Sequence, residues 1–209
     1  MLTRWLLHPN LFTRFLAFLI VVGILFFLAW ALSYALLPEG VLRGRTAAAA
    51  LAGETAAASF WAEWARIAAV NLAVCLCAVI APNLIKNPSG VPLGYTTTAL
   101  LAALYAVTLG TNSFTLPLPG GPLAPTLAVF QRSGPYEITA YVLAAASTVS
   151  IARWALRGRW PRQVLEPWAP PADRRMGPTE WVGLALAAAL LLAANAWEAW
   201  QIIAMFGSP

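Results

Sequence analysis

The stretch Ser133–Trp154, SGPYEITAYVLAAASTVSIARW, decides how this chain is organised. It is a run of small apolar residues with a single carboxylate, Glu137, close to its start and Arg153 close to its end. About 20 apolar residues are long enough to cross the hydrocarbon core of a bilayer as a helix. We therefore predict a membrane-spanning helix over 136–156. Glu137 would lie in its first turn, where a carboxylate meets the positive end of the helix dipole.

The composition of the whole chain points to a membrane protein. Of its 209 residues, 60% are hydrophobic and 10% are charged, and the mean hydropathy is +0.71. A soluble domain carries about 25% charged residues, so lipid must cover much of this surface. The formal net charge of +5 is typical of a membrane protein with cytoplasmic arginines. No nucleic-acid-binding motif accompanies it, and we expect no nucleic-acid partner.

Four further runs are long and apolar enough to cross a membrane. The first exceeds the apolar core of about 7–15 residues that a signal peptide carries, so it is interpreted as an uncleaved span. The sequence thus predicts an all-α, polytopic helical bundle of about five transmembrane helices in a single membrane domain, 1–209. The four further spans are expected at about 12–37, 60–80, 91–111 and 179–205.

Three longer connections differ in character. Residues 38–59 are rich in alanine, which favours helix, but lack large apolar side chains, so we expect a short helix at the outer surface or an extension of the second span. Residues 112–134 contain four prolines and three glycines, which predicts a loop folded onto the membrane face or among the helices. Residues 157–178 form a basic, proline-containing inner loop.

The distribution of arginine and lysine sets the orientation. With the N-terminus inside, nine of the thirteen Lys and Arg residues fall on the inner side and four on the outer side, as the positive-inside rule requires. Most of the ten tryptophans lie near predicted span ends, where amphipathic rings prefer to sit. We predict that the N-terminus faces the cytoplasm.

Polar residues within the spans are the candidates for function, because buried polar groups in a membrane are costly and often functional. Glu63 and Arg66 lie three apart, which places them on one helix face and predicts an interfacial ion pair. Arg66 is also a candidate partner for Glu137. Such residues either bind helices together or line a polar path. The structural or pathway candidates are Glu63, Arg66, Asn71, Glu137, Ser147 and Asn195.

The remaining reactive residues do not form a catalytic constellation. Cys75 and Cys77 lie two apart in a predicted helix and point to nearly opposite sides, so we interpret them as small apolar residues. The single histidine, His8, precedes the first span and could ligate the magnesium of a pigment. It lies at the opposite membrane face from the outer serines, so a nucleophile lacks its base. We expect no enzymatic activity.

Part of the chain resembles a known family of membrane proteins. The stretches "NLAVCLCAVIAPNLIKN", "GVPLGYTTTALLAAL" and "SGPYEITAYVLAAASTVSIAR" are similar to the stage II sporulation protein M family over residues 71–157. The last of them looks like that family's His-Gly-x-x-Glu-x-x-Ala pattern, with Gly134, Glu137 and Ala140 matching and Ser133 in place of the histidine. Gly94 stands where the family tends to place a glycine.

The resemblance implies a protein of about five spans in the bacterial inner (cytoplasmic) membrane that works with partners. The named member acts in a complex that helps to remodel the cell wall, and some relatives have been likened to transporter permeases. The resemblance makes Glu137 the residue of greatest interest. A function that depends on the missing histidine is not carried over to this chain.

Three functional hypotheses follow. The first is a non-enzymatic scaffold or accessory subunit of a larger membrane complex, whose partners are the lipid bilayer and other membrane proteins or further copies of the chain. It would make helix–helix contacts through small-residue faces, such as that of 136–156, and through the outer alanine-rich and proline-rich segments. The second is a transporter or channel component with a polar path in an oligomer. The residues expected to line this path are Asn71, Thr97, Tyr105, Ser147 and Glu137. The third is a pigment-associated subunit of a photosynthetic complex that uses His8.

Overall fold

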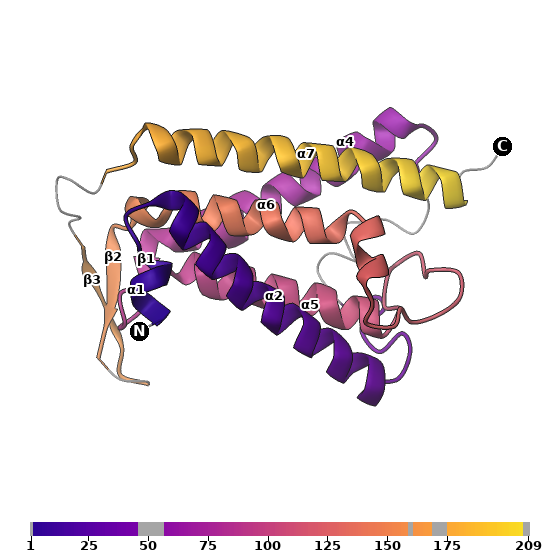
Figure 1. Cartoon of the computed structure of the whole chain (residues 1–209), viewed down its shortest axis with the longest axis horizontal. Coiled ribbons are helices and arrows are strands. Elements are labelled where there is room, and N and C mark those ends of the chain that lie inside the picture. The colour runs from indigo at the N-terminus through magenta and orange to yellow at the C-terminus, as the bar shows by residue number, and fades with distance from the viewer. Residues whose placement is uncertain (1, 46–56, 159–160, 169–174, 207–209) are drawn as a thin grey trace.

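The computed structural model describes residues 2–45, 57–158, 161–168 and 175–206. The chain is mostly helical (Figure 1). The helices are α1 (Leu2–Leu6), α2 (Leu11–Leu36), α4 (Phe60–Val74), α5 (Leu93–Gly110), α6 (Gly134–Ser147) and α7 (Pro178–Phe206), and the strands are β1 (Ile85–Lys86), β2 (Trp154–Arg157) and β3 (Val164–Pro167). Short turns of other helix types follow α4 and flank α6.

Four helical segments of the described chain are long and apolar enough to cross a membrane. They are Leu11–Leu36, Phe60–Leu84, Leu93–Gly110 and Pro178–Phe206. Their outward surfaces carry large apolar side chains, such as Phe12, Ile24 and Leu28 on α2. The coarse prediction of an apolar helical bundle agrees with this architecture.

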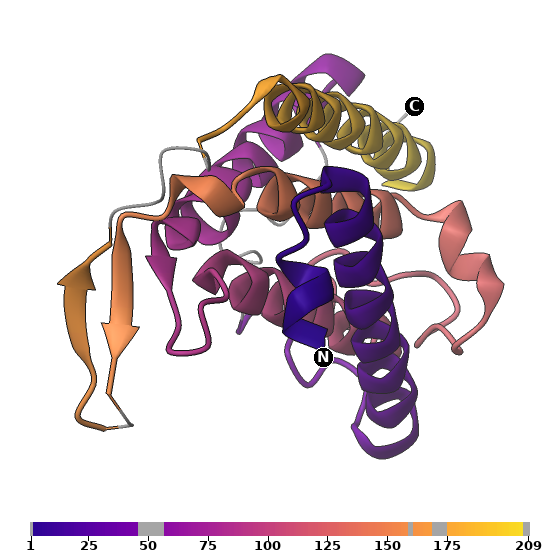
Figure 2. The same ribbon diagram turned by 60° about the vertical axis from the view of Figure 1, so that its left-hand side comes forward.

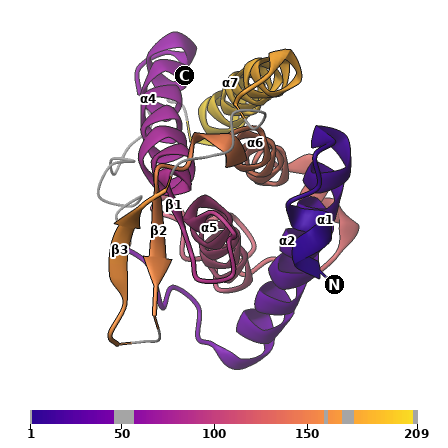
Figure 3. The same cartoon turned by 90° about the vertical axis from the view of Figure 1, so that its left-hand side faces the viewer.

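The prediction of a membrane-spanning helix over 136–156, the fourth predicted span, is wrong. The helix α6 ends at Ser147, the chain then makes a short 3-10 turn, and it continues as strand β2 from Trp154. At 1.5 Å per residue the 14 residues of α6 extend about 21 Å, less than the ~30 Å hydrocarbon core. Nine of them are buried, because α6 lies between α2, α5 and α7 in the middle of the bundle (Figures 1 and 3).

A short helix can end inside a bundle only if its last carbonyl groups find hydrogen-bond donors. Here Arg14 of α2 donates from Nε to the carbonyl of Ala146 at 2.8 Å. Asn83 donates from Nδ2 to the carbonyl of Ala145 at 2.9 Å and to Oγ1 of Thr148 at 2.7 Å. The Thr148 hydroxyl in turn donates to the carbonyl of Ala144 at 2.8 Å. Side chains from distant segments therefore cap α6.

The second membrane-length segment changes its helical winding where its proline approaches. After α4 the chain forms a π-helical turn, Cys75–Ile80, and then a 3-10 turn, Ala81–Leu84, that contains Pro82. Proline cannot donate a hydrogen bond to the carbonyl four residues earlier, which is that of Ala78. The Thr97 hydroxyl of α5 donates to this carbonyl instead.

A small three-stranded sheet lies at the end of the bundle where α2, α5 and α7 begin. We call this end of the bundle the sheet end. Its order is β1-β2-β3, with β1 parallel to β2 and β2 antiparallel to β3. Figure 2 shows β2 and β3 projecting beside the helices. The expected all-α fold omits this sheet, part of which falls in the predicted inner loop.

The loops complete the fold at both ends. Residues of the 112–134 connection fold back onto the bundle, where Trp30 donates from Nε1 to the carbonyl of Leu123 at 2.8 Å. Residues 46–56 of the alanine-rich segment lie outside the described residues.

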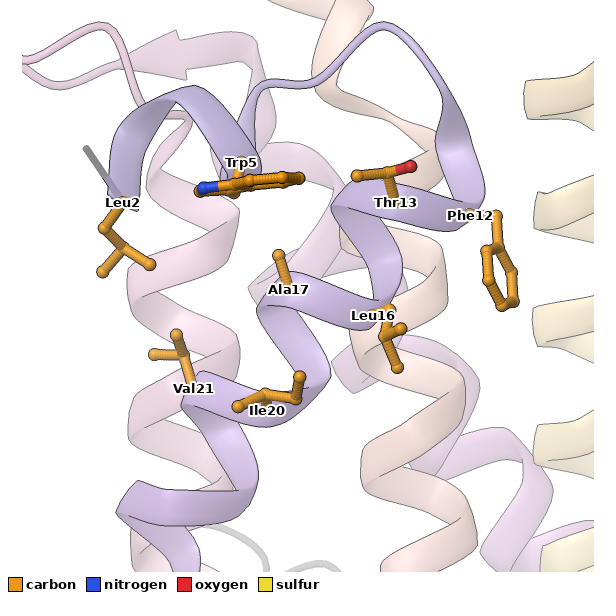
Figure 4. A pocket seen from close by; sticks show the side chains of 8 residues that line it. All are labelled: Leu2, Trp5, Phe12, Thr13, Leu16, Ala17, Ile20 and Val21. Carbon is orange, nitrogen blue, oxygen red and sulfur yellow. The ribbon is translucent and has the colours of Figure 1, made fainter.

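At the sheet end, α1 folds back along α2 and leaves an apolar groove of about 380 Å³ (Figure 4). Its lining residues are Leu2, Trp5, Phe12, Thr13, Leu16, Ala17, Ile20 and Val21.

Candidate functional site at the carboxylate end

Three glutamates gather at the end of the bundle where α4 and α6 begin and α7 ends, which we call the carboxylate end. They are Glu63 of α4, Glu137 of α6 and Glu198 of α7. Each comes from a different helix, and these helices pack as the pairs α4–α7 and α6–α7. Three acidic groups in an otherwise apolar bundle are expensive, so their partners decide what the site can do.

Glu63 has its charge compensated. Its side chain is 0% exposed and forms an ion pair with Arg66 on the next turn of α4. Its second carboxylate oxygen accepts the backbone N–H of Ala57 at 2.8 Å. The charge of Glu63 is therefore compensated, and the loss of either partner would leave a buried group without compensation.

Glu137 and Glu198 are a different kind of pair, because their carboxyl groups lie within hydrogen-bonding reach of each other. Glu137 also lies beside the side chains of Asn71 and Ser133. One oxygen of Glu137, Oε1, is buried without a hydrogen-bond partner in the described structure. Two carboxylates this close repel when both are charged, and an ionised carboxyl group has no proton to donate. The pair therefore needs a shared proton or a cation.

A chain of neutral polar groups surrounds this pair. Asn71 of α4 donates from Nδ2 to Oδ1 of Asn195 on α7 at 2.7 Å. Tyr141 of α6 donates its hydroxyl to Oδ1 of Asn71 at 3.1 Å. Asn195 is 0% exposed, and its Nδ2 has no partner among the described residues. Three helices are thus joined by side-chain hydrogen bonds next to the carboxyl pair.

A close contact of α5 with α6 forms one wall of the site. Gly134, the first residue of α6, lies against the ring of Tyr105, and a Cβ at this position would overlap the ring carbons and the hydroxyl. The Tyr105 ring also packs on Phe26 of α2 and Phe114 of the following loop, with ring centroids 6.1 Å apart in both pairs. Only glycine lets α6 begin this close to α5.

The other two candidates lie at the sheet end, away from the carboxyl pair. Ser147 ends α6 and packs against Gly183 of α7, where its Oγ has no described partner. His8 accepts the backbone N–H of Asn10 on Nδ1 at 3.1 Å and stacks on Trp5 with ring centroids 6.3 Å apart. This places His8 in the turn before α2, and it does not line the apolar groove. A single polar path through both Ser147 and Glu137 is not formed by the described contacts.

The structure brings several of the sequence candidates together and pairs them differently from the expectation. Glu63, Arg66, Asn71, Glu137 and Asn195 all lie at the carboxylate end. The sequence made Arg66 a candidate partner for Glu137, but Arg66 forms an ion pair with Glu63. Glu198 was not among the sequence candidates, and it is the residue whose carboxyl group lies beside that of Glu137. Its spacing of three from Asn195 could have indicated a shared helix face.

The described residues hold no cluster of three or more histidine, cysteine or acidic side chains with metal-binding geometry. Comparison of the chain with family models, curated proteins and solved structures gives no match. The resemblance to the stage II sporulation protein M family therefore stays a prediction.

Proposed function

We propose that this protein is a non-enzymatic membrane transport component that takes up a proton or a small monovalent cation between Glu137 and Glu198. The observation that carries the proposal is the proximity of these two carboxyl groups, with Oε1 of Glu137 buried and accepting no hydrogen bond from a described donor. A shared proton or a cation would remove the repulsion between the groups and the cost of the unpartnered oxygen.

The surrounding architecture supports the same function. Ionisable groups within membrane bundles commonly mark proton or ion pathways. Transporters often build their binding sites around helices that do not cross the whole bilayer, and α6 is such a helix. Glu137 stands in its first turn, close to the side-chain amides and hydroxyls that would solvate a small ion.

The scaffold hypothesis loses one of its supports. It relied on the small residues of the fourth predicted span as a contact surface for partners. Ala140, Ala144 and Ala145 of α6 are buried inside the chain, so they serve the packing of this bundle. The four membrane-length helices of the described residues make a thin pore, and we propose that the protein works as an oligomer or with larger membrane partners. We expect it in a bacterial inner membrane with the sheet end on the cytoplasmic side.

The test is a flux measurement on the full chain in liposomes. We expect proteoliposomes to dissipate an imposed pH gradient, or a sodium or potassium gradient, faster than empty liposomes. Glu137→Gln and Glu198→Gln should each reduce the rate to that of empty liposomes. Glu166→Gln serves as the matched control, because Glu166 is an exposed acid of β3 at the other end.

Two results would overturn the proposal. One is a wild-type flux equal to that of empty liposomes for all three ions. The other is full flux in the folded Glu137→Gln protein. Far-ultraviolet circular dichroism and a monodisperse elution profile establish that each variant is folded.

A further inference from the structure

The strands β2 and β3 form a hairpin whose base is held to the bundle. At its base, Trp154 pairs with Ile85 of β1 and with Pro167 of β3. The backbone N–H of Trp168 donates to the carbonyl of Arg153 at 2.6 Å. The ammonium group of Lys86 lies 4.7 Å from the centre of the Trp168 ring. These contacts hold the hairpin to the sheet end of the bundle.

The direction of the hairpin is set by this base. Its strands run across the long axis of the helices and extend to one side of the bundle (Figures 1 and 3). If the membrane-length helices cross the bilayer, the hairpin lies parallel to the membrane surface at the sheet end. Two exposed tryptophans, Trp5 and Trp181, lie at the same end of the bundle, as expected for residues at a membrane interface.

The hairpin exposes apolar side chains on both of its faces. The register places Leu156 opposite Leu165 on one face and Arg157 opposite Val164 on the other. Leu165 is 50% exposed and Val164 is 55% exposed. A two-stranded hairpin with apolar groups on both faces is poorly stabilised in water. The headgroup layer of a membrane offers apolar contact to either face.

The charge of the hairpin is positive. Arg153, Arg157 and Arg162 are exposed, and the acid among the described hairpin residues, Glu166, lies 3.8 Å from Arg157. Basic residues at a membrane surface attract anionic lipid headgroups. The charge is thus complementary to an anionic leaflet.

We propose that the β2–β3 hairpin is a lipid-binding element that lies in the headgroup layer at the sheet end and prefers anionic phospholipids. It extends the lipid contact of the protein beyond its helices. It is independent of the ion site at Glu137 and Glu198, because it rests on a different end of the molecule and on different residues.

The experiment measures the depth of the hairpin in a bilayer. The full chain, with Cys75→Ala and Cys77→Ala, carries a spin label introduced through Val164→Cys and is placed in nanodiscs of phosphatidylcholine with increasing phosphatidylglycerol. We expect the label to be relaxed more by oxygen, which partitions into lipid, than by a water-soluble nickel complex. This preference should grow with the phosphatidylglycerol content.

Two exposed arginines give matched variants for the test. Arg162→Gln should reduce the dependence on phosphatidylglycerol. Arg45→Gln, at the carboxylate end, removes the same charge and should leave it unchanged. A label that contacts the nickel complex in every lipid mixture would overturn the proposal and would favour a protein partner for the hairpin. A depth that does not depend on phosphatidylglycerol would overturn the preference for anionic lipid.

A second measurement avoids the label. Native mass spectrometry of the unmodified chain, released from mixed nanodiscs, counts the phosphatidylglycerol molecules that stay bound. We expect fewer in Arg157→Gln/Arg162→Gln than in the wild type or in Arg45→Gln. Equal numbers in all three would contradict the proposal.

Discussion

Arg14 and Ala146 are joined by a hydrogen bond of 2.8 Å from the guanidinium Nε to the backbone carbonyl. This bond connects α2, the first membrane-length helix, to the last turn of α6. Arg14 also donates to the carbonyls of His8 and Pro9 and forms a 2.8 Å ion pair with Glu180 of α7. One buried arginine therefore ties α2, α6 and α7 together at the sheet end.

Replacing Arg14 should destabilise the protein strongly. Arg14→Met leaves the Ala146 carbonyl without this donor and Glu180 without its cation, and breaking a buried pair from one side costs about 3–5 kcal/mol. The partial exposure of Glu180 makes the lower value more realistic. Thermal unfolding in detergent measures the effect. Arg4→Met, on the exposed side of α1, should change the stability little, and an equal effect of both variants would contradict the tying role.

The hydrogen bond between Asn71 and Asn195 should show as a coupling energy. We expect Asn71→Leu and Asn195→Leu to be non-additive by about 0.6–1.7 kcal/mol, the range for side-chain hydrogen bonds in membrane bundles. A double-mutant cycle on the free energy of unfolding measures it. Asn71→Leu combined with Thr13→Val, on α2 at the sheet end, should be additive. Additivity in the asparagine cycle would rule out the bond.

Gly134→Ala should destabilise the junction of α5 and α6. The added methyl group would overlap the Tyr105 ring, and such overpacking costs about 1–3 kcal/mol. The control is Gly23→Ala on α2, where a Cβ would meet nothing within 4 Å. In that helix alanine should be neutral or stabilising, because it has the higher helix propensity. Urea unfolding in mild detergent compares the two variants, and a tolerated Gly134→Ala would show that Tyr105 can move away.

Glu63 and Arg66 should depend on each other. Glu63→Gln breaks this partly buried ion pair from one side and should cost up to about 3 kcal/mol. Glu63→Gln/Arg66→Gln removes both charges and should recover part of this loss. The yield of monodisperse protein and its unfolding midpoint report the outcome. If the double variant is no more stable than Glu63→Gln, the ion pair is not the reason that Glu63 is tolerated in the bundle.

Much of the fold could be predicted because bilayer thickness and hydropathy act locally. The spans near 12–37, 60–80, 91–111 and 179–205 each satisfy the length and composition that lipid demands, and each matches a helical segment. The glutamates and asparagines could be selected in the same way, because polar groups are rare in such segments. Gly94 and Gly134 could be noted from the sequence as single positions, without the contacts that require them.

The fourth predicted span shows where local reasoning stops. Residues 136–156 have the composition of a membrane helix, and nothing in their own sequence ends the helix at Ser147. The end is possible because Arg14 and Asn83, which lie 132 and 62 residues away from their carbonyl acceptors, supply the missing donors. Hydrogen bonds between such distant residues depend on how the helices pack, which hydropathy does not encode.

The sequence by itself determined that this is an apolar helical chain with a few buried acids and amides, because these properties follow from composition and spacing. Only the tertiary structure decided which acids meet. Glu137 lies beside Glu198 rather than in the ion pair considered for it, since α6 and α7 pack side by side at the carboxylate end. The hairpin was equally hidden, because its strands are short and its pairing to β1 joins segments about 70 residues apart.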